Sequence, residues 1–195
     1  MATLTSQLES VNVMLGHVGE SPINTLTGAG SLPVSATAAL AALNEVSKEI
    51  QSEGWHFNSE KDVTLSPVSG TINVPEDAVQ VDAEDKSLDI VQRGTALFDR
   101  ANNTSTFTES IKVNLIRLLN WDSLPEEARR YITLRASRIF QGRIVGSREL
   151  EALIARDEYQ ARSRLEESDY GSSDRTIFDN YDAATRIGVN RNYDI

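Results

Sequence analysis

Six arginines within 24 residues offer the clearest binding chemistry in this sequence. Residues 125–148 contain no lysine and carry a net charge of +4, although the whole chain carries −10. The arginines are Arg129, Arg130, Arg135, Arg138, Arg143 and Arg148. A guanidinium group binds carboxylate or phosphate through paired hydrogen bonds. The stretch therefore predicts a site for phosphate or for an acidic protein surface. The alternative is a solvated helix face whose arginines pair with carboxylates of the same chain.

The other side chains give little support for catalysis. His17 and His56 belong to different predicted elements, and neither fits a zinc-binding H-E-x-x-H pattern or a triad order. The chain has no cysteine, which excludes disulfides and thiolate metal sites. The sequence Gly28-Ala29-Gly30 lacks the Lys-Ser/Thr of a phosphate-binding P-loop. We therefore predict a protein that is not an enzyme and that has no cofactor and no metal.

Two other functional classes stay open. Carboxylates are abundant, as at Glu126-Glu127 and Glu166-Glu167, and a glycan-degrading hydrolase needs two of them facing each other across a cleft. A small binding domain of another assembly is also compatible with this composition. No apolar run is long enough to span a membrane, and residues 1–5 do not resemble a signal peptide. We therefore expect no membrane partner.

Most of these arginines lie within the first of two predicted helices. Residues 123–126 (SLPE) are typical of a capping box, and apolar residues recur at helical spacing over 128–140. Two glycines interrupt the pattern. Ser147 can then cap a second helix that carries the same spacing to Leu165. The two helices are expected to fold back on each other as an antiparallel hairpin.

Two more helices are predicted in the first 60 residues. Residues 6–9 (SQLE) form another capping box, which starts a short amphipathic helix. An alanine-rich helix is predicted over residues 35–53. Ser35 can serve as its N-cap, and Gly54 can end it. The aromatic residues Trp55 and Phe57 come directly afterwards, and we expect them to plug the core.

Between residues 62 and 119 the apolar period changes from 3.6 to 2, which is typical of half-buried strands. Turn-forming residues separate the short alternating segments. The candidate strands cover residues 63–65, 71–74, 78–81, 88–91, 95–98 and 107–119. This pattern predicts a small antiparallel sheet inserted between the helices.

These elements together predict an α+β fold. It would consist mainly of a bundle of four main helices in two hairpin-like pairs, with the inserted small antiparallel sheet and an extended C-terminal arm. The expected helical domain is discontinuous, over 1–61 and 120–169, and the inserted β domain covers 62–119. The arm covers 170–195.

The predicted arm has no steady period, yet large apolar residues are scattered through it. The residues concerned are Tyr170, Ile177, Phe178, Tyr181, Ile187 and Tyr193. A segment of this composition often becomes ordered on the surface of a partner. The alternative is a floppy chain end.

Four stretches of the chain, in this order, resemble one protein family. Residues 11–26 (VNVMLGHVGESPINTL) are similar to the pattern VN-x-x-L-x-x-x-GE-x-P-[VI]-x-x-L, and residues 50–58 (IQSEGWHFN) to I-Q-x-x-GW-x-FN. Residues 124–140 contain LPE, Tyr and AS-R-x-F at matching places, and residues 167–171 read ESDYG. The chain thus resembles the tail tubular protein A adaptors of short-tailed, T7-like bacteriophages.

The resemblance implies a structural protein of the virion, made in the host cytoplasm and placed at the head–tail junction. Family members form a ring, held to be twelve-fold, between the portal of the capsid and the tail nozzle. Genomic DNA passes through the channel of the ring without sequence-specific binding. The acidic balance of this chain suits such a conduit, because a basic lining would retain the phosphate backbone.

Within this family, the charged stretch and the arm would have separate roles. We expect the arginines at 129, 130, 135, 138 and 143 to face neighbouring subunits or the channel rim. We expect the arm to bind the portal protein.

Overall fold

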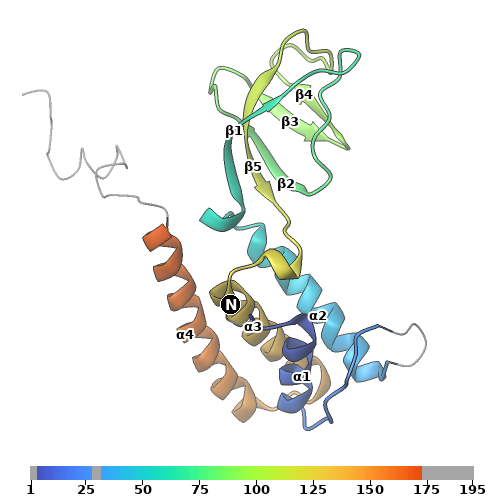
Figure 1. The fold of residues 1–195 in the computed structure, drawn as a ribbon, viewed down its shortest axis with the longest axis vertical. Helices are drawn as coiled ribbons and strands as arrows, with labels where there is room; N and C mark the ends of the chain where they lie inside the picture. Colours follow the sequence, from blue (N-terminus) through green and yellow to red (C-terminus); the bar gives the residue numbers. More distant parts are fainter. Residues whose placement is uncertain (1–3, 28–31, 173–195) are drawn as a thin grey trace, which may run out of the picture.

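The computed structural model describes residues 4–27 and 32–172 of the chain, which form an elongated α+β molecule with helices at one end and strands at the other (Figure 1). The predicted α+β class is therefore confirmed. The helices are α1 (Gln7–His17), α2 (Val34–Gln51), α3 (Glu126–Ile144) and α4 (Arg148–Ser172). The strands are β1 (Ser59–Leu65), β2 (Ala78–Ala83), β3 (Ile90–Arg93), β4 (Ala96–Asp99) and β5 (Ile111–Arg117). Two short 3-10 helices, η1 (His56–Asn58) and η2 (Trp121–Ser123), lie where the chain passes between the two ends.

Helix α3 lies at the centre of the helical end. Four consecutive residues, 131–134, are buried, which requires a helix that is covered on several sides. Helices α1, α2 and α4 provide this cover, and α4 runs back along α3 (Figure 1). Trp55 and Phe57 stack with a centroid distance of 6.5 Å and pack into the same core, as predicted.

The strands form two antiparallel sheets around a second apolar cluster. The order is β1-β5-β2 in the larger sheet, and β3 pairs with β4 in the smaller one. The predicted strand at 71–74 is wrong: this segment makes only an isolated bridge from Asn73 to Ala96, besides its Thr71 bridge to Val68. The next residue is Pro75, which has no backbone N–H to extend the pairing.

The predicted capping boxes have different outcomes. Ser6 and Glu9 form the expected box at the start of α1. Helix α3 instead begins after Pro125 without a side-chain cap, because Leu124 before the proline adopts an extended backbone. The Glu126 carboxylate is used elsewhere, since it accepts hydrogen bonds from the backbone N and hydroxyl of Thr5.

Two further helix boundaries differ from the prediction. Helix α2 begins at Val34 rather than Ser35 and ends at Gln51 rather than Glu53. Its N-cap residue is Pro33, whose carbonyl accepts hydrogen bonds from both the backbone N and the hydroxyl of Thr37. The proline therefore replaces the predicted serine cap.

A buried polar junction joins the helical end to the strands. The Gln51 side chain donates to the carbonyl of Leu119 (3.2 Å) and accepts from its N–H (2.7 Å). Asn58 Nδ2 donates to the carbonyls of Gln51 and Arg117, both at 2.8 Å. Asn58 Oδ1 accepts from the N–H of Trp55 at 2.9 Å. Gln51 and Asn58 are at most 2% exposed, so water does not compete for these bonds. The bonds hold together the two segments that connect the helical end to the strands.

Gly54 lies at this junction in the left-handed backbone region, with φ +77°. A Cβ there would lie 2.6 Å from Ile116 Cδ1. We expect Gly54→Ala to lower the free energy of unfolding by about 1–3 kcal/mol, measured by urea denaturation. Gly142→Ala is the matched control, since a Cβ there meets open space on a helix, and it should raise stability by up to about 1 kcal/mol. Equal stability of the two variants would contradict this expectation.

Candidate functional site

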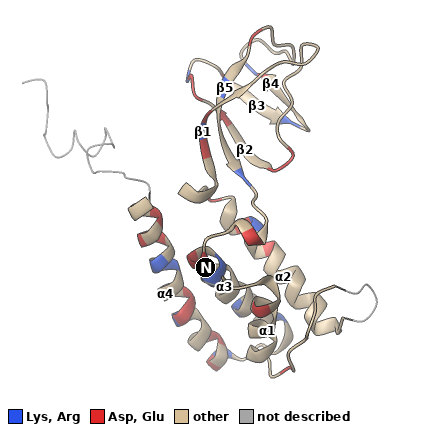
Figure 2. Ribbon diagram, in the orientation of Figure 1, with Lys and Arg blue, Asp and Glu red and all other residues tan. Residues whose placement is uncertain are grey.

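Glu45 and Glu49 of α2, together with Glu53 two residues after its end, form a stripe of glutamates at four-residue spacing. Each one pairs with an arginine of α3 or α4. The pairs are Glu45–Arg143 at 2.9 Å, Glu49–Arg135 at 2.6 Å and Glu53–Arg162 at 3.5 Å. We call these three glutamates the α2 acidic stripe. The ion pairs connect α2 to the two helices that carry most of the arginines (Figure 2).

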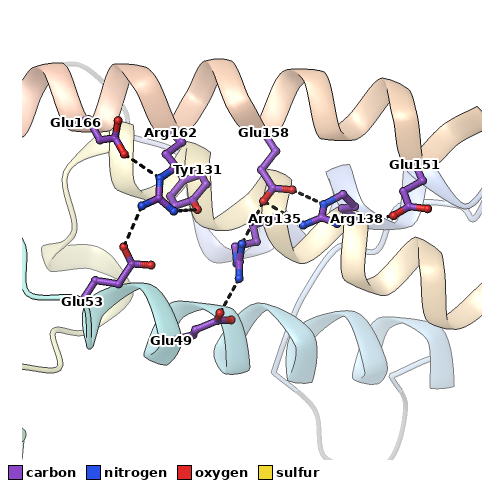
Figure 3. Close-up of polar contacts among 9 residues, drawn as sticks. All are labelled: Glu49, Glu53, Tyr131, Arg135, Arg138, Glu151, Glu158, Arg162 and Glu166. Carbon is purple, nitrogen blue, oxygen red and sulfur yellow. Dashed lines mark hydrogen bonds and ion pairs between the residues drawn. The ribbon is translucent and has the colours of Figure 1, made fainter.

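Glu158 of α4 is the central carboxylate of the same network (Figure 3). Its side chain is only 10% exposed, and it accepts from Arg138 Nε at 2.5 Å and from Arg135 Nη1 at 3.3 Å. Arg138 also lies 3.7 Å from Glu151. Arg135 therefore bridges α2 and α4, while Arg138 holds two turns of α4 against α3.

Arg162 forms a second node on α4. Its Nε donates to Glu166 at 2.8 Å, and Nη1 donates to the hydroxyl of Tyr131 at 3.2 Å. The guanidinium carbon also lies 5.8 Å from the centre of the Tyr131 ring. The hydrogen bonds that Arg162 donates to Glu166 and Tyr131 raise the pKa of its guanidinium, so Arg162 stays charged.

The ion pairs also shift the pKa values of Glu45, Arg138 and Arg143 toward their charged forms. The hydrogen bond from Arg143 lowers the pKa of Glu45, and the same bond raises the pKa of Arg143. The hydrogen bond to Glu158 raises the pKa of Arg138 in the same way. These groups therefore remain ionised at neutral pH, and their charges are used within the chain.

A shallow hollow of about 240 Å³ lies over this network. Its lining residues are Tyr131, Arg135, Arg138, Ala155, Glu158, Tyr159 and Arg162. The guanidinium groups in it already bind carboxylates or a phenol, which leaves few donors for a phosphate ligand. The hollow therefore favours a structural role for these arginines over anion binding.

The structure places the predicted arginines in three different settings. Arg129 is 3% exposed, and its guanidinium donates to the carbonyls of Leu124, Thr5 and Asp122 at 2.8–2.9 Å. Those at 135, 138 and 143 form the ion pairs described above. These contacts favour the alternative of pairing within the chain. Arg130 is exposed, and it has no ion pair among the residues that the structure describes. The assignment of these arginines to subunit contacts remains a prediction.

Sequence reasoning missed the carboxylates that the arginines bind. The spacing of the α2 acidic stripe was a usable signal, because three glutamates four residues apart lie on one face of a helix. Glu158 gave no such signal, since it occupies a position in the apolar stripe of α4 between Ile154 and Leu165. The partners of Glu158 are identified only by the packing of α4 against α3.

Helix α4 continues through Tyr170 to Ser172, so the first three residues of the predicted arm, 170–172, are helical. The arm itself remains a prediction. The helix end is held by Asp169, whose carboxylate accepts from the N–H of His56 at 2.6 Å. Tyr170 is 71% exposed on α4. Ile177, Phe178, Tyr181, Ile187 and Tyr193 lie outside the described residues.

A hollow of about 630 Å³ lies at the strand end of the molecule. Asp99 lines it, and the N–H of Asn102 lowers the pKa of this carboxyl and closes the turn after β4. Among the described residues, no group of three or more His, Cys, Asp or Glu is placed to hold a metal ion. In the same part of the chain, no helix combines the length and the apolar character needed to cross a membrane.

A family model described as "Tube: Tail tubular protein" matches residues 8–174. The match covers all four helices except the first residue of α1, and all five strands. A search of curated proteins found no match to the chain.

Proposed function

Because this chain belongs to the tail tubular protein family, we propose that it is a ring-forming adaptor that joins the portal to the tail nozzle of a short-tailed bacteriophage. Family membership itself identifies a structural protein of the phage tail, located in the virion. The observation that carries the proposal is the family match over 167 of 195 residues, because it spans both the helices and the inserted strands. It gives no support to the alternative of a glycan-degrading hydrolase.

In this proposal the discontinuous helical domain, 1–61 and 120–169, forms the body of the ring as a bundle of two hairpin-like helix pairs. The inserted β domain, 62–119, projects from it. A ring subunit must keep its two lateral faces at a fixed angle for the ring to close. The buried bonds of Gln51 and Asn58 support this requirement, because they hold the strands rigidly on the helices.

The proposed partners are further copies of the chain, the portal protein and the nozzle protein. We propose a dodecamer with genomic DNA passing through its channel. The net charge of −10 supports a conduit that DNA traverses without sequence-specific binding, since like charges prevent retention. The part of the predicted arm that follows Ser172 is the proposed contact with the portal.

Reconstitution tests this proposal. Purified portal, this protein and nozzle protein are mixed in pairs and together, and the products are imaged by electron microscopy. We expect a ring of added density on the portal, and nozzle binding only when that ring is present. Direct binding of nozzle to portal, with this protein absent from the complex, would contradict the adaptor role.

Truncation after Ser172 tests the arm separately. The truncated chain keeps every helix and strand that the structure describes, so it should still fold, and cooperative thermal unfolding checks this. We expect it to lose portal binding. A truncated protein that binds the portal as tightly as the full chain would contradict the arm assignment and leave the ring unaffected.

A further inference from the structure

Helix α4 carries a ridge of side chains that the described residues, 4–27 and 32–172, leave exposed. Leu150, Leu153, Arg156 and Tyr159 follow one another at three-residue spacing, so their side chains lie next to each other in a row across the outer surface of the helix. Leu153 is 63% exposed and Tyr159 is 74% exposed. We call these four residues the α4 ridge. Such a row is the surface that packs into the groove of another helix.

The ridge belongs to the most apolar part of the described surface. Of the twelve exposed large hydrophobic residues in residues 4–27 and 32–172, five lie between 144 and 159. Ile144 and Val145 extend the ridge around the turn between α3 and α4, and both are about half exposed. Clustered apolar surface of this kind marks a protein contact rather than scattered exposure.

Arg156 gives the ridge its charge. It is exposed, and no carboxylate among the described residues lies within ion-pair distance of it. The adjacent Asp157 interacts electrostatically with His17 of α1, whereas Glu151 and Glu158 pair with arginines of α3. The partner of the ridge should therefore offer a carboxylate beside a surface with small side chains.

A second copy of this chain offers such a surface on α2. The α2 acidic stripe includes Glu45 and Glu49, whose side chains remain 58% and 51% exposed although each pairs with an arginine. A carboxylate has lone pairs for a further donor. Ala41, one turn before Glu45, is exposed and leaves room for large side chains of the ridge.

Helices α2 and α4 flank α3 (Figure 1). We propose that the α4 ridge of one copy docks onto the α2 face of the next copy, with Arg156 beside Glu45 and Tyr159 and Leu153 over Ala41. This contact joins two different faces, so it is head-to-tail and repeats from copy to copy until the ring closes. It rests on the proposed ring and specifies which surfaces form it.

Engineered cysteines test the contact directly, because the chain contains none. We would place Cys at Ala41 in one protein and at Gln160, one turn after Arg156, in another, and treat the assembled mixture with a short bismaleimide reagent. We expect covalent dimers from the mixture and none from either single variant. Val68→Cys mixed with Gln160→Cys is the control, since Val68 is exposed on the strand end, and it should give none.

Substitution of the ridge provides a second measurement. Leu153→Asp and Tyr159→Asp change exposed residues, so both should fold normally and reduce the assembled fraction at least tenfold. Val68→Asp is the control and should assemble as the unmodified chain does. Normal assembly of both ridge variants would overturn the inference. Dimers from Gln160→Cys alone would also overturn it, by showing α4 against α4. If the unmodified chain does not assemble, with or without portal, that result would instead contradict the proposal that the protein forms a ring.

Discussion

Asn58→Asp is expected to lower the free energy of unfolding by about 3 kcal/mol or more. The native amide donates to two carbonyls, those of Gln51 and Arg117, and accepts from the N–H of Trp55. An aspartate of the same shape keeps the accepted bond but turns both donated bonds into contacts between oxygen atoms. The site is 2% exposed, so water cannot compensate. Urea denaturation at pH 7 measures the loss.

The loss in Asn58→Asp should depend on pH. Two carbonyls and burial both disfavour the ionised form, so the folded-state pKa of the new carboxyl lies above its unfolded value of about 3.9. The folded state then binds more protons than the unfolded state, and stability falls as pH rises from about 4 toward the folded pKa. Asn44→Asp is the matched control, because Asn44 is exposed and its Oδ1 accepts from Gln7. Equal losses in the two variants would contradict the junction described here.

Glu158→Gln is the second substitution with a large expected effect, about 2–3 kcal/mol. It removes the charge shared by Arg135 and Arg138, whose guanidinium groups then repel each other with only the amide oxygen between them. Both arginines are 24–31% exposed, so solvent reduces the loss below that of a fully buried pair. Glu49→Gln is the control: Glu49 is 51% exposed, and its loss should stay under about 1 kcal/mol.

Hydrogen exchange shows where the Glu158→Gln defect lies. Apart from Glu158, the buried side chains of α4 are Ile154, Ala161 and Leu165, so the helix depends on the polar network for much of its attachment. We expect faster exchange in α4 and little change in β1, β2 and β5. Uniformly faster exchange over the whole molecule would instead indicate global destabilisation without a specific role in α4 docking.

Local patterns predicted much of the secondary structure. The Ser6 capping box and the apolar spacing of α3 were sufficient, because both depend on residues within a few positions of each other. The strands at 63–65, 78–81, 88–91 and 95–98 followed from alternation in the same way, with shifts of a few residues at the ends. Alternation did not predict that they divide into two sheets, since pairing depends on distant segments.

The failures have a common physical cause, which is a competing partner far away in the chain. Glu126 fits a capping box with Ser123, but Thr5, 121 residues away, takes its carboxylate. Arg135, Arg138 and Arg143 likewise pair with carboxylates far away in the sequence, and their contacts with neighbouring subunits or the channel rim remain a prediction. Residue type predicted the chemistry of these side chains correctly, and only the tertiary structure shows which groups they bind.

The copy number of the assembled protein tests the central claim most directly. Native mass spectrometry of the purified chain, alone and with its portal, measures that number without assuming any interface. We predict one closed species with a fixed number of copies, twelve in our proposal, either alone or on the portal. A chain that stays monomeric in both samples, or that forms open series of every size, would contradict the adaptor ring.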